Sequence, residues 1–583
     1  MNDIKHELEQ KILQALDVAF AEDLSGTDPQ LKVTTQPDFG DYQANLAMSL
    51  ARTLGKKPRE IADEIVQHLD LDGVCEKVEI AGPGFINLYL SQEFIDARIN
   101  SLARDSQLGL DKPAQASKIV LDYSAPNVAK EMHVGHLRST VIGDAIARVL
   151  ERLGHTVVRQ NHMGDWGTQF GMLIEFLIDE GWNSGQSSTS IGEFEERYKA
   201  AKKKFDADED FRERARNRVV ALQGGDENTL RAWQFLVEES NRHFSDVYRR
   251  LGVLLEESDN CPESFYNPQL GDIVDELKRK GLLETSQGAE VVFLEGFVDR
   301  EDKPLPMIVR KADGGFLYAT TDLAAVRYRV NELKASRVIY VTDARQAQHF
   351  AMIFSAVKRA GWVKEGVELD HVPFGTVLGK DKKPFKTRDG GTIKLVDLLE
   401  EAQERARDVL LSKNQSLAES ELESLSRIIS VGALKYADLS GDRIKDYVFD
   451  WDRMLSLEGN TAPYLLNAYV RILSIFRKGE MELVDADAYS ISVQHVAEKK
   501  LALKLFQYSD SVNSVAEKLE PHRLCTFLYE LSSLFHAFYE ACPILKDDVT
   551  EGTRKSRLAL CRLTEKTIRD GLSLLGIETV EKM

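Results

Sequence analysis

Residues 124–138 read SAPNVAKEMHVGHLR, and the interpretation of the whole chain starts from them. The run before them, residues 118–123 (KIVLDY), is short, apolar and rich in β-branched residues, which predicts a strand. Pro126 should hold Ala125 in an extended conformation and end that strand. After the quoted stretch, apolar residues recur at helical spacing over 136–153 until a glycine follows. The stretch is therefore predicted to be the loop between a strand and a helix.

This loop brings His133, Gly135 and His136 to the first turn of the predicted helix. Unpaired backbone N–H groups and the positive end of the helix dipole favour an anion there, and two imidazoles suit phosphate oxygens. Gly135 has no Cβ and would let a flat base lie against the backbone. A single histidine in such a place is more often a cap or a surface residue. The order of strand, loop, paired histidines and helix nevertheless favours a nucleotide site of a doubly wound sheet.

Length and composition describe a globular chain of several domains. It has 583 residues, 43% hydrophobic and 29% charged, which suggests about three domains. The net charge of −19 disfavours a generally basic nucleic-acid binder, so any RNA contact must come from local patches. The cysteines lie far apart with no C-x-x-C pair, so we expect reduced thiols and no zinc site. Without a signal-peptide core or a long apolar run, the protein is expected to be cytoplasmic, with no membrane contact.

Residues 1–112 are predicted to form a small α/β domain. Helical patterns cover residues 4–20 and 43–53, and residues 78–90 have strand character that a Gly-Pro-Gly sequence interrupts. Asp41 is expected to cap the second helix. A hinge near the end of this domain leads into the next part of the chain.

Residues 113–450 alternate between strand and helix patterns, which predicts a parallel sheet of Rossmann type. Long charged helices at about 183–250 interrupt the alternation as a helical insertion with a solvated face. The sheet pattern is expected to resume with a hairpin that turns on residues 313–315, followed by a helix from about Asp322. A polar loop at 161–167 should lie where open α/β sheets bind ligands. The predicted strands are residues 118–123, 156–160, 290–297, 337–343 and 371–379.

Two further segments complete the chain. Residues 380–391 (KDKKPFKTRDGG) form a basic loop, which could close over a triphosphate and neutralise leaving pyrophosphate, or could be a plain surface loop. Residues 451–583 are helical by period and predict a bundle, which by itself could be a dimerisation or interaction module. The predicted fold class is α/β: a Rossmann-type domain with a parallel sheet, preceded by a small α/β domain and followed by an all-α helical bundle.

These motifs resemble those of a known family. Residues 133–136 (HVGH) resemble the HIGH signature of class I aminoacyl-tRNA synthetases, and SAPNVAK before them is similar to the arginyl-tRNA synthetase version. Residues 384–388 (PFKTR) resemble the KMSKS loop in its arginyl form, with Thr387 where the last lysine would be. The resemblance implies Lys130 as the substitute for that lysine. It implies ATP binding at His133, Gly135, His136, Val377 and Leu378, and catalytic roles for His133, His136, Lys130, Lys383, Lys386 and Arg388.

A pocket for arginine must pair a planar, permanently charged guanidinium, and carboxylates do this through two parallel charge-assisted bonds. Lysine or a neutral analogue would leave those carboxylates badly paired, which provides discrimination. Taken singly, Asp322 reads as a helix cap and Glu263 as a surface charge. The resemblance implies that the arginine-binding residues are Asn127, Glu263, Tyr318, Asp322 and Gln346.

The resemblance also implies partners and a reaction. Residues 1–112 would contact the tRNA elbow, where Phe85 and Asn87 would meet a D-loop base by stacking and by an amide hydrogen bond. Residues 451–583 would bind the anticodon, with Met583 beside the anticodon loop. The chain, as a monomer, would activate L-arginine with ATP and Mg²⁺ and transfer it to the 3′ end of tRNA(Arg). Enzymes of this family usually need tRNA before they activate arginine.

Two rival interpretations stay open at this point. A class I synthetase for another amino acid would share the histidine signature, although the acidic constellation and the missing KMSKS lysine favour arginine. A non-catalytic RNA-binding or regulatory relative would keep the fold without turnover. The intact His133, Gly135, His136, Glu263 and Asp322 argue against that second alternative.

Overall fold

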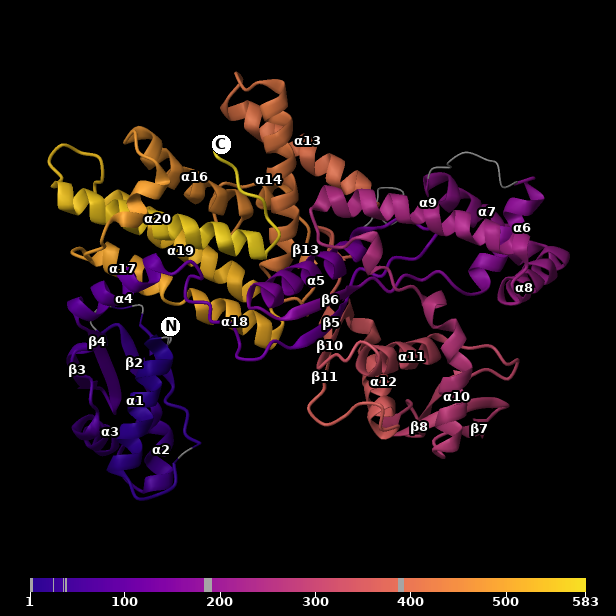
Figure 1. Ribbon diagram of the computed structural model, residues 1–583, viewed down its shortest axis with the longest axis horizontal. Helices are drawn as coiled ribbons and strands as arrows, with labels where there is room; N and C mark the ends of the chain where they lie inside the picture. The colour runs from indigo at the N-terminus through magenta and orange to yellow at the C-terminus, as the bar shows by residue number, and fades with distance from the viewer. Residues whose placement is uncertain (1–3, 25, 35, 37–38, 183–190, 386–392) are drawn as a thin grey trace.

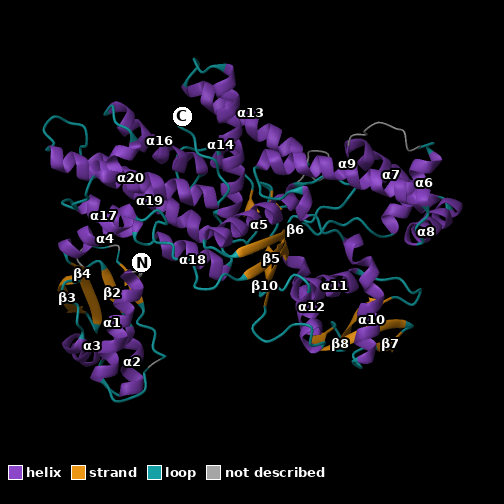
Figure 2. Ribbon diagram, viewed as in Figure 1, coloured by secondary structure: helices purple, strands orange, loops and turns teal. Residues whose placement is uncertain are grey.

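The computed structural model describes residues 4–24, 26–34, 36, 39–182, 191–385 and 393–583. Figure 1 shows an elongated molecule, with the N-terminal domain at one end, the helical insertion at the other and the central sheet between them. The C-terminal helices extend over the N-terminal domain and the sheet, and Figure 2 shows small sheets set in a largely helical chain. Within the described residues, no helix combines the length and the apolar character needed to cross a bilayer.

The central sheet is parallel and has the strand order β11-β10-β5-β6. Its strands confirm the predicted strands at 118–123, 156–160 and 337–343 and the start of the one at 371–379. The chain passes from β5 to β6 on one side of β5 and returns to β10 on the other, so the topological switch point lies between β5 and β10. Open α/β sheets bind ligands at the carboxyl ends of such strands. The strands are β5 (Lys118–Asp122), β6 (Thr156–Gln160), β10 (Arg337–Asp343) and β11 (Glu368–Phe374).

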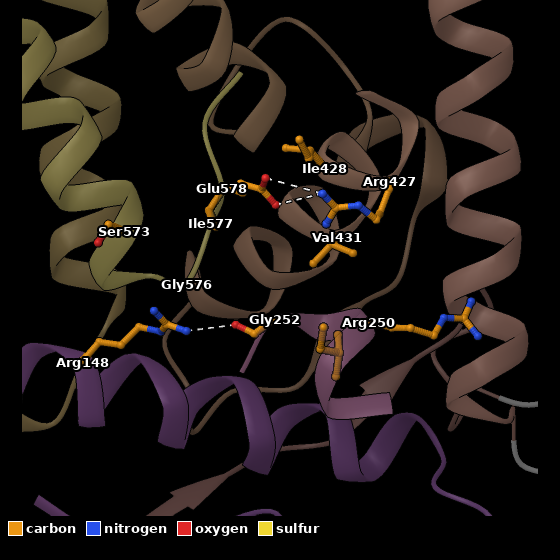
Figure 3. A pocket seen from close by; sticks show the side chains of 11 residues that line it. Arg148, Arg250, Gly252, Arg427, Ile428, Val431, Ser573, Gly576, Ile577 and Glu578 are labelled. Atoms are coloured by element: carbon orange, nitrogen blue, oxygen red, sulfur yellow. Dashed lines mark hydrogen bonds and ion pairs between the residues drawn. The ribbon is translucent and has the colours of Figure 1, made fainter. Parts of the chain in front are cut away.

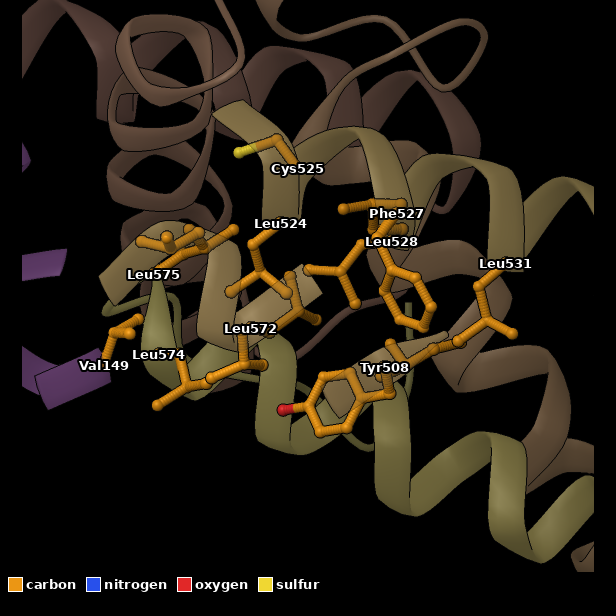
Figure 4. Close-up of a cluster of buried hydrophobic side chains, with 14 of the residues drawn as sticks. Val149, Tyr508, Leu524, Cys525, Phe527, Leu528, Leu531, Leu572, Leu574 and Leu575 are labelled. Carbon is orange, nitrogen blue, oxygen red and sulfur yellow. The ribbon is translucent and has the colours of Figure 1, made fainter. Parts of the chain in front are cut away.

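Helix α5 (Val134–Arg152) begins at the histidine signature and joins the sheet to the C-terminal helices. Gly143 allows it to approach β5, because a Cβ there would lie 2.3 Å from an atom of the Tyr123 ring. At its other end, Val149 belongs to a buried cluster with leucines of α19 (His522–Ala541) and α20 (Glu551–Leu574), as Figure 4 shows. The helix is therefore buried on more sides than the single apolar face that its sequence predicts.

Buried charges also tie α5 to α14 (Glu419–Leu439). The guanidinium of Arg138 lies 3.2 Å from the carboxylate of Asp438, and neither side chain is more than 2% exposed. Burial raises the pKa of Asp438, although the charge of Arg138 opposes this shift. The pair therefore fixes α5 against α14 only as long as both partners are present.

A second junction connects α5 and α14 to the C-terminal tail. The ammonium of Lys435 donates to the carbonyls of Gly576 at 2.7 Å and Gly252 at 3.3 Å, and burial lowers its pKa to about 8. Arg148 of α5 donates to the same Gly252 carbonyl at 2.9 Å. Figure 3 shows Arg148 and Gly252 at the edge of a cavity of about 260 Å³ between these elements. The C-terminal tail, the end of the helical insertion and helix α5 thus meet beside this cavity.

The loop after β5 differs from the prediction. Ala125 has a φ of +49°, in the left-handed region, and not the extended conformation expected before Pro126. Ser124 (φ +73°) and Ala129 (φ +62°) are left-handed as well, a conformation that is uncommon for residues other than glycine. Side-chain oxygens accept from these three N–H groups: Ser139 from Ser124 at 2.9 Å, Asn161 from Ala125 at 3.0 Å and Ser240 from Ala129 at 2.9 Å. Bonds from distant residues therefore override the local preference.

The predicted hairpin is wrong in two respects: its strands do not join the parallel sheet, and its turn is not at residues 313–315. β8 (Ala289–Val298) and β9 (Pro304–Arg310) form a separate antiparallel sheet with β7 (Glu284–Ser286), apart from the central sheet in Figure 2. Residues 299–303 turn between β8 and β9, whereas residues 313–315 close a single bridge from Arg310 to Phe316. Helix α11 (Tyr318–Asn331) begins before Asp322. Strand patterns do not say which sheet a strand joins.

The helical insertion also starts earlier than predicted, at α6 (Thr168–Asp179). It continues through α7 (Ile191–Ala207), α8 (Glu209–Gln223) and α9 (Glu227–Leu251). The predicted strand at 371–379 divides, because Gly375 passes close to Asp446 and the chain then forms β12 (Val377–Leu378), which pairs with β13 (Tyr447–Val448). The smaller elements of this part are α10 (Leu270–Arg279), α12 (Ala347–Arg359) and α15 (Trp451–Met454).

The N-terminal domain has the sheet order β1-β2-β4-β3. Asp41 does not cap the second helix, because β2 intervenes; its carboxylate accepts from the Leu90 N–H at 2.8 Å and pairs with Lys499 at 2.8 Å. Lys499 belongs to the C-terminal bundle, so Asp41 docks one domain on the other. The elements are α1 (Ile4–Ala19), β1 (Leu31–Val33), β2 (Tyr42–Ala44), α2 (Leu46–Leu54), α3 (Pro58–His68), β3 (Cys75–Ala81), β4 (Phe85–Leu90) and α4 (Gln92–Arg104).

The C-terminal bundle is helical as predicted, and its packing extends to α14, before residue 451. Helix α14 contacts both α5 and α16, so it belongs to the domain of the central sheet and to the bundle at once. The remaining helices are α13 (Leu395–Lys413), α16 (Ala462–Lys478), α17 (Val496–Leu505) and α18 (Tyr508–Lys518).

Candidate active site

His133 and His136 lie at the start of α5 with ring nitrogens oriented by the backbone. His133 is the N-cap residue, and its Nδ1 accepts from the Gly135 N–H at 3.1 Å. His136 Nδ1 accepts from the His133 N–H at 3.1 Å, and the ring centroids are 4.0 Å apart. A nitrogen that accepts carries no hydrogen, so each neutral ring holds its hydrogen on Nε2. Two Nε2–H donors beside a helix N-terminus suit phosphate oxygens.

The charge state of His136 and the identity of residue 135 both follow from this packing. Burial, with added repulsion from His133 and Lys130, lowers the pKa of His136 to about 3, so the ring is a neutral donor at physiological pH. A Cβ on Gly135 would lie 2.8 Å from Cε1 of His133. The structure therefore gives the glycine a role beyond the predicted approach of a base: it makes room for the His133 ring on its own helix turn.

Helices of the insertion contact the loops that follow β5 and β6. On α9, the Tyr248 hydroxyl lies 2.7 Å from Ser124 Oγ and accepts from Asn161 at 3.1 Å. On α7, the ring of Tyr198 lies 4.8 Å from the ammonium of Lys130, a cation–π contact. Neither tyrosine is identifiable from the sequence, because aromatic residues on a helix more often pack into a core.

The basic loop is anchored at both ends. Phe385 stacks on Phe449 with ring centroids 4.5 Å apart, which fixes the hairpin that follows β12 and carries Lys383. At the other end, residues 393–395 pair with residues 132–134 through backbone hydrogen bonds of 2.8 and 3.1 Å. The loop therefore returns to the histidine signature. The predicted residues Lys386 and Arg388 lie outside the described residues.

Acidic side chains gather where the loop after β6 approaches α11. Burial, with added repulsion from Asp165 and Asp322, raises the pKa of Glu263 to about 8. Both oxygens of buried Asp165 accept from Ser264, one from its N–H at 2.9 Å and one from its hydroxyl at 2.6 Å. Both oxygens of Asp165 are thus engaged by Ser264, whereas Asp322 is bonded through one oxygen and keeps further acceptor sites. The structure thus brings together two of the predicted arginine-binding residues.

The other predicted arginine-binding residues are accessible. Tyr318, the first residue of α11, is 71% exposed, and Gln346 and Asn127 are exposed as well. Asn127 forms an isolated β-bridge with Gly164, where a Cβ would lie 2.4 Å from its Oδ1. Asn127 therefore belongs to the loop pair at the ends of β5 and β6.

His349 is a further residue of this region that was not predicted; its Nε2 lies 2.6 Å from Asp322 Oδ2. Burial would lower the pKa of His349, but the hydrogen bond and the charge of Asp322 outweigh burial and raise it. The available signal was its position three residues after Gln346, which places both on one helical face.

The predicted RNA-binding residues have contrasting surroundings. Asn87 is 1% exposed and its Oδ1 accepts from Gln43 Nε2 at 2.8 Å, so this oxygen is already engaged within the N-terminal domain. Phe85 is half-buried. Met583 is 40% exposed and lines an open cavity of about 820 Å³. The charged residues that line this cavity are Arg471, Arg477, Lys478, Lys582, Glu421 and Glu540, a local excess of positive charge.

Comparison with family models covers nearly the whole chain. A model described as tRNA synthetases class I (R), catalytic domain, matches residues 98–451. The arginyl tRNA synthetase N terminal domain model matches residues 6–90, and the DALR anticodon binding domain model matches residues 465–583.

Individual proteins give the same result. The chain is 50% identical to the arginine–tRNA ligase of Klebsiella pneumoniae over 99% of both chains, and 51% identical to that of Pseudoalteromonas atlantica over 95% of both. Its fold is similar to the arginyl-tRNA synthetase structures from Plasmodium falciparum (31% identity, TM-score 0.86) and Thermus thermophilus (25% identity, TM-score 0.79), each with 100% coverage of both chains. By sequence and by fold, the chain belongs to the arginyl-tRNA synthetase family.

Proposed function

We propose that both steps of arginine–tRNA ligation take place in the crevice at the carboxyl ends of β5 and β10. Family membership gives the overall reaction: aminoacylation of tRNA(Arg) with arginine, with ATP as a substrate. Arginine would first form arginyl-adenylate with loss of pyrophosphate, and the arginyl group would then pass to the 3′ end of the tRNA with loss of AMP. Two observations carry the proposal: the buried Glu263 carboxyl interacts electrostatically with Asp322, and two histidines with oriented rings stand at the start of α5.

ATP would lie with its phosphates at the N-terminus of α5. His133 and His136 supply Nε2–H donors there, and Lys130 and Lys383 supply positive charge for the leaving pyrophosphate, together with Lys386 and Arg388. Gly135 and the backbone of Val377 and Leu378 would flank the nucleoside. Mg²⁺ is usually held by substrate phosphates and water, so we propose that it enters with ATP.

The guanidinium of arginine would lie between Glu263 and Asp322, which accept its charge-assisted hydrogen bonds. Tyr318 and Gln346 lie on the neighbouring helix starts, and Asn127 would hold the amino or carboxylate end of the substrate. The in-line attack of the arginine carboxylate on the α-phosphate asks no covalent step of the protein, so positioning and charge stabilisation supply the catalysis.

For the tRNA, we propose contacts at both ends of the molecule. Residues 1–112 would meet the elbow through Phe85, and through Asn87 once its bond to Gln43 opens. Residues 451–583 would bind the anticodon stem and loop, with the cavity beside Met583 as the basic local patch. Residues 113–450 form the catalytic domain. We propose a monomer that acts in the cytoplasm, the compartment in which its arginine and tRNA substrates occur.

ATP–pyrophosphate exchange by the full chain, with each amino acid and with or without tRNA(Arg), tests the proposal. Of the amino acids, only arginine is expected to support exchange, and only when tRNA(Arg) is present. Asp322→Ala should abolish exchange with arginine and leave ATP binding unchanged, whereas Asp313→Ala, in an exposed turn, is a matched control. Exchange with another amino acid would overturn the arginine pocket. No exchange under any condition would favour a non-catalytic RNA-binding protein.

A further inference from the structure

Two helix starts meet beside the proposed arginine pocket. Asp322 lies in the first turns of α11 and His349 in the first turn of α12, which follows β10 at the switch point. His349 Nε2 lies 2.6 Å from Asp322 Oδ2, and their side chains are 31% and 15% exposed. A carboxylate cannot donate, so Nε2 carries the hydrogen and donates to Asp322.

The His349 ring has little freedom to turn. It meets the edge of Phe350 at 5.3 Å between centroids, and Phe350 stacks on His371 at 5.0 Å. His371 in turn lies within hydrogen-bond distance of Thr342 Oγ1, at 2.8 Å, on β10. The central sheet thereby supports the ring that holds Asp322.

We propose that His349 is a positioning residue for arginine, which fixes the Asp322 carboxylate in the plane that receives the guanidinium. The inference rests on the proposed function, because it assigns Asp322 to the arginine pocket. An ionised carboxylate has acceptor sites for about four hydrogen bonds, so one bond to His349 leaves room for the substrate.

The expected consequence is specific to a planar substrate group. Two parallel hydrogen bonds to guanidinium require a fixed carboxylate plane, whereas an ammonium acts as a compact point charge that tolerates rotation. Loss of His349 should therefore weaken arginine recognition more than recognition of lysine. Binding of ATP and tRNA should be unaffected, because neither contacts Asp322 in the proposed site.

The test compares His349→Ala and His349→Gln with the unchanged chain in steady-state aminoacylation. The glutamine variant keeps an N–H donor close to the position of Nε2. We expect His349→Ala to raise the KM for arginine by about tenfold or more, with smaller changes in kcat and in the KM values for ATP and tRNA. His349→Gln should recover most of the affinity. Gln348→Ala, at an exposed neighbour, is the matched control and should behave as the unchanged chain.

A double-mutant cycle with Asp322→Asn separates positioning from general support of the fold. Arginine binding is measured by calorimetry, so that inactive variants still report, and thermal melting shows whether each variant folds. In the Asp322→Asn background, His349→Ala should have no further effect. An undiminished effect there, equal losses for all three substrates, or an alanine variant that binds arginine normally would overturn the inference. An unchanged chain that does not use arginine would instead refute the proposed function.

Discussion

Replacing Glu263 with glutamine should remove a pH dependence from arginine binding. Burial and the charges of Asp165 and Asp322 raise the pKa of this carboxyl to about 8, so it is largely protonated near neutral pH while the pocket is empty. A guanidinium requires the ionised form as its hydrogen-bond acceptor. Each pH unit below about 8 should therefore weaken arginine binding by about tenfold, or about 1.4 kcal/mol.

The pKa of Glu263 in the arginine complex sets the lower limit of the pH range in which affinity changes. A positive charge at about 4 Å contributes about 4 kcal/mol at the effective dielectric of a protein surface, which would lower the pKa of Glu263 well below its value in the empty pocket. The free pocket thus binds a proton that the complex does not, so affinity rises with pH up to about 8 and is level above. Near pH 7, binding should release about one proton from Glu263.

Isothermal titration calorimetry of arginine binding, in buffers of different ionisation enthalpy between about pH 6 and 8, measures both quantities. The unchanged chain should show the slope and the released proton. Glu263→Gln should lose both the pH dependence of the affinity and the proton release. Glu256→Gln, at an exposed glutamate close in sequence, should retain both. His349 is present in the unchanged chain and in both variants, so the difference between their pH dependences isolates the contribution of Glu263. An identical slope in Glu263→Gln and the unchanged chain would refute the placement of Glu263 in the pocket.

Other substitutions test separate parts of the structure. Gly135→Ala should displace the His133 ring and lower the rate of ATP–pyrophosphate exchange by about a hundredfold, and an exchange rate near that of the unchanged chain would contradict the described ring packing. Arg138→Met should destabilise the fold by about 3–5 kcal/mol in denaturant titration, because it leaves buried Asp438 unpaired; Arg138→Met with Asp438→Leu should lose much less. Phe385→Ala should release the basic loop and raise the KM for ATP by up to about tenfold, with the KM for arginine unchanged, and a selective effect on arginine would speak against the loop assignment.

Local patterns predicted the elements that local physics dominates. The apolar runs of β5, β6 and β10 and the period of α1 and α5 identified strands and helices correctly. The hairpin of β8 and β9 was assigned to the wrong sheet, since strand character does not encode a strand's partner. Ala125 was expected to be extended, but the hydrogen bond from its N–H to Asn161 Oδ1 helps to hold it in the left-handed region. Asn87 is predicted to meet an RNA base, and the structure adds that its side chain is buried and accepts a hydrogen bond from Gln43.

By itself, the sequence determined the order of elements, the histidine signature at a helix start and the kinds of charged side chain available to a site. These properties depend on neighbours a few residues apart, so periodicity and turn chemistry reveal them. The tertiary structure alone decided which distant groups meet: Glu263 with Asp322, Asp322 with His349, and Lys435 with the carbonyls of Gly252 and Gly576. Each of these interactions joins segments far apart in the chain. Burial raises the pKa of Glu263 and lowers that of Lys435, whereas Asp322 raises the pKa of His349. Their chemistry therefore comes from packing, which no local pattern contains.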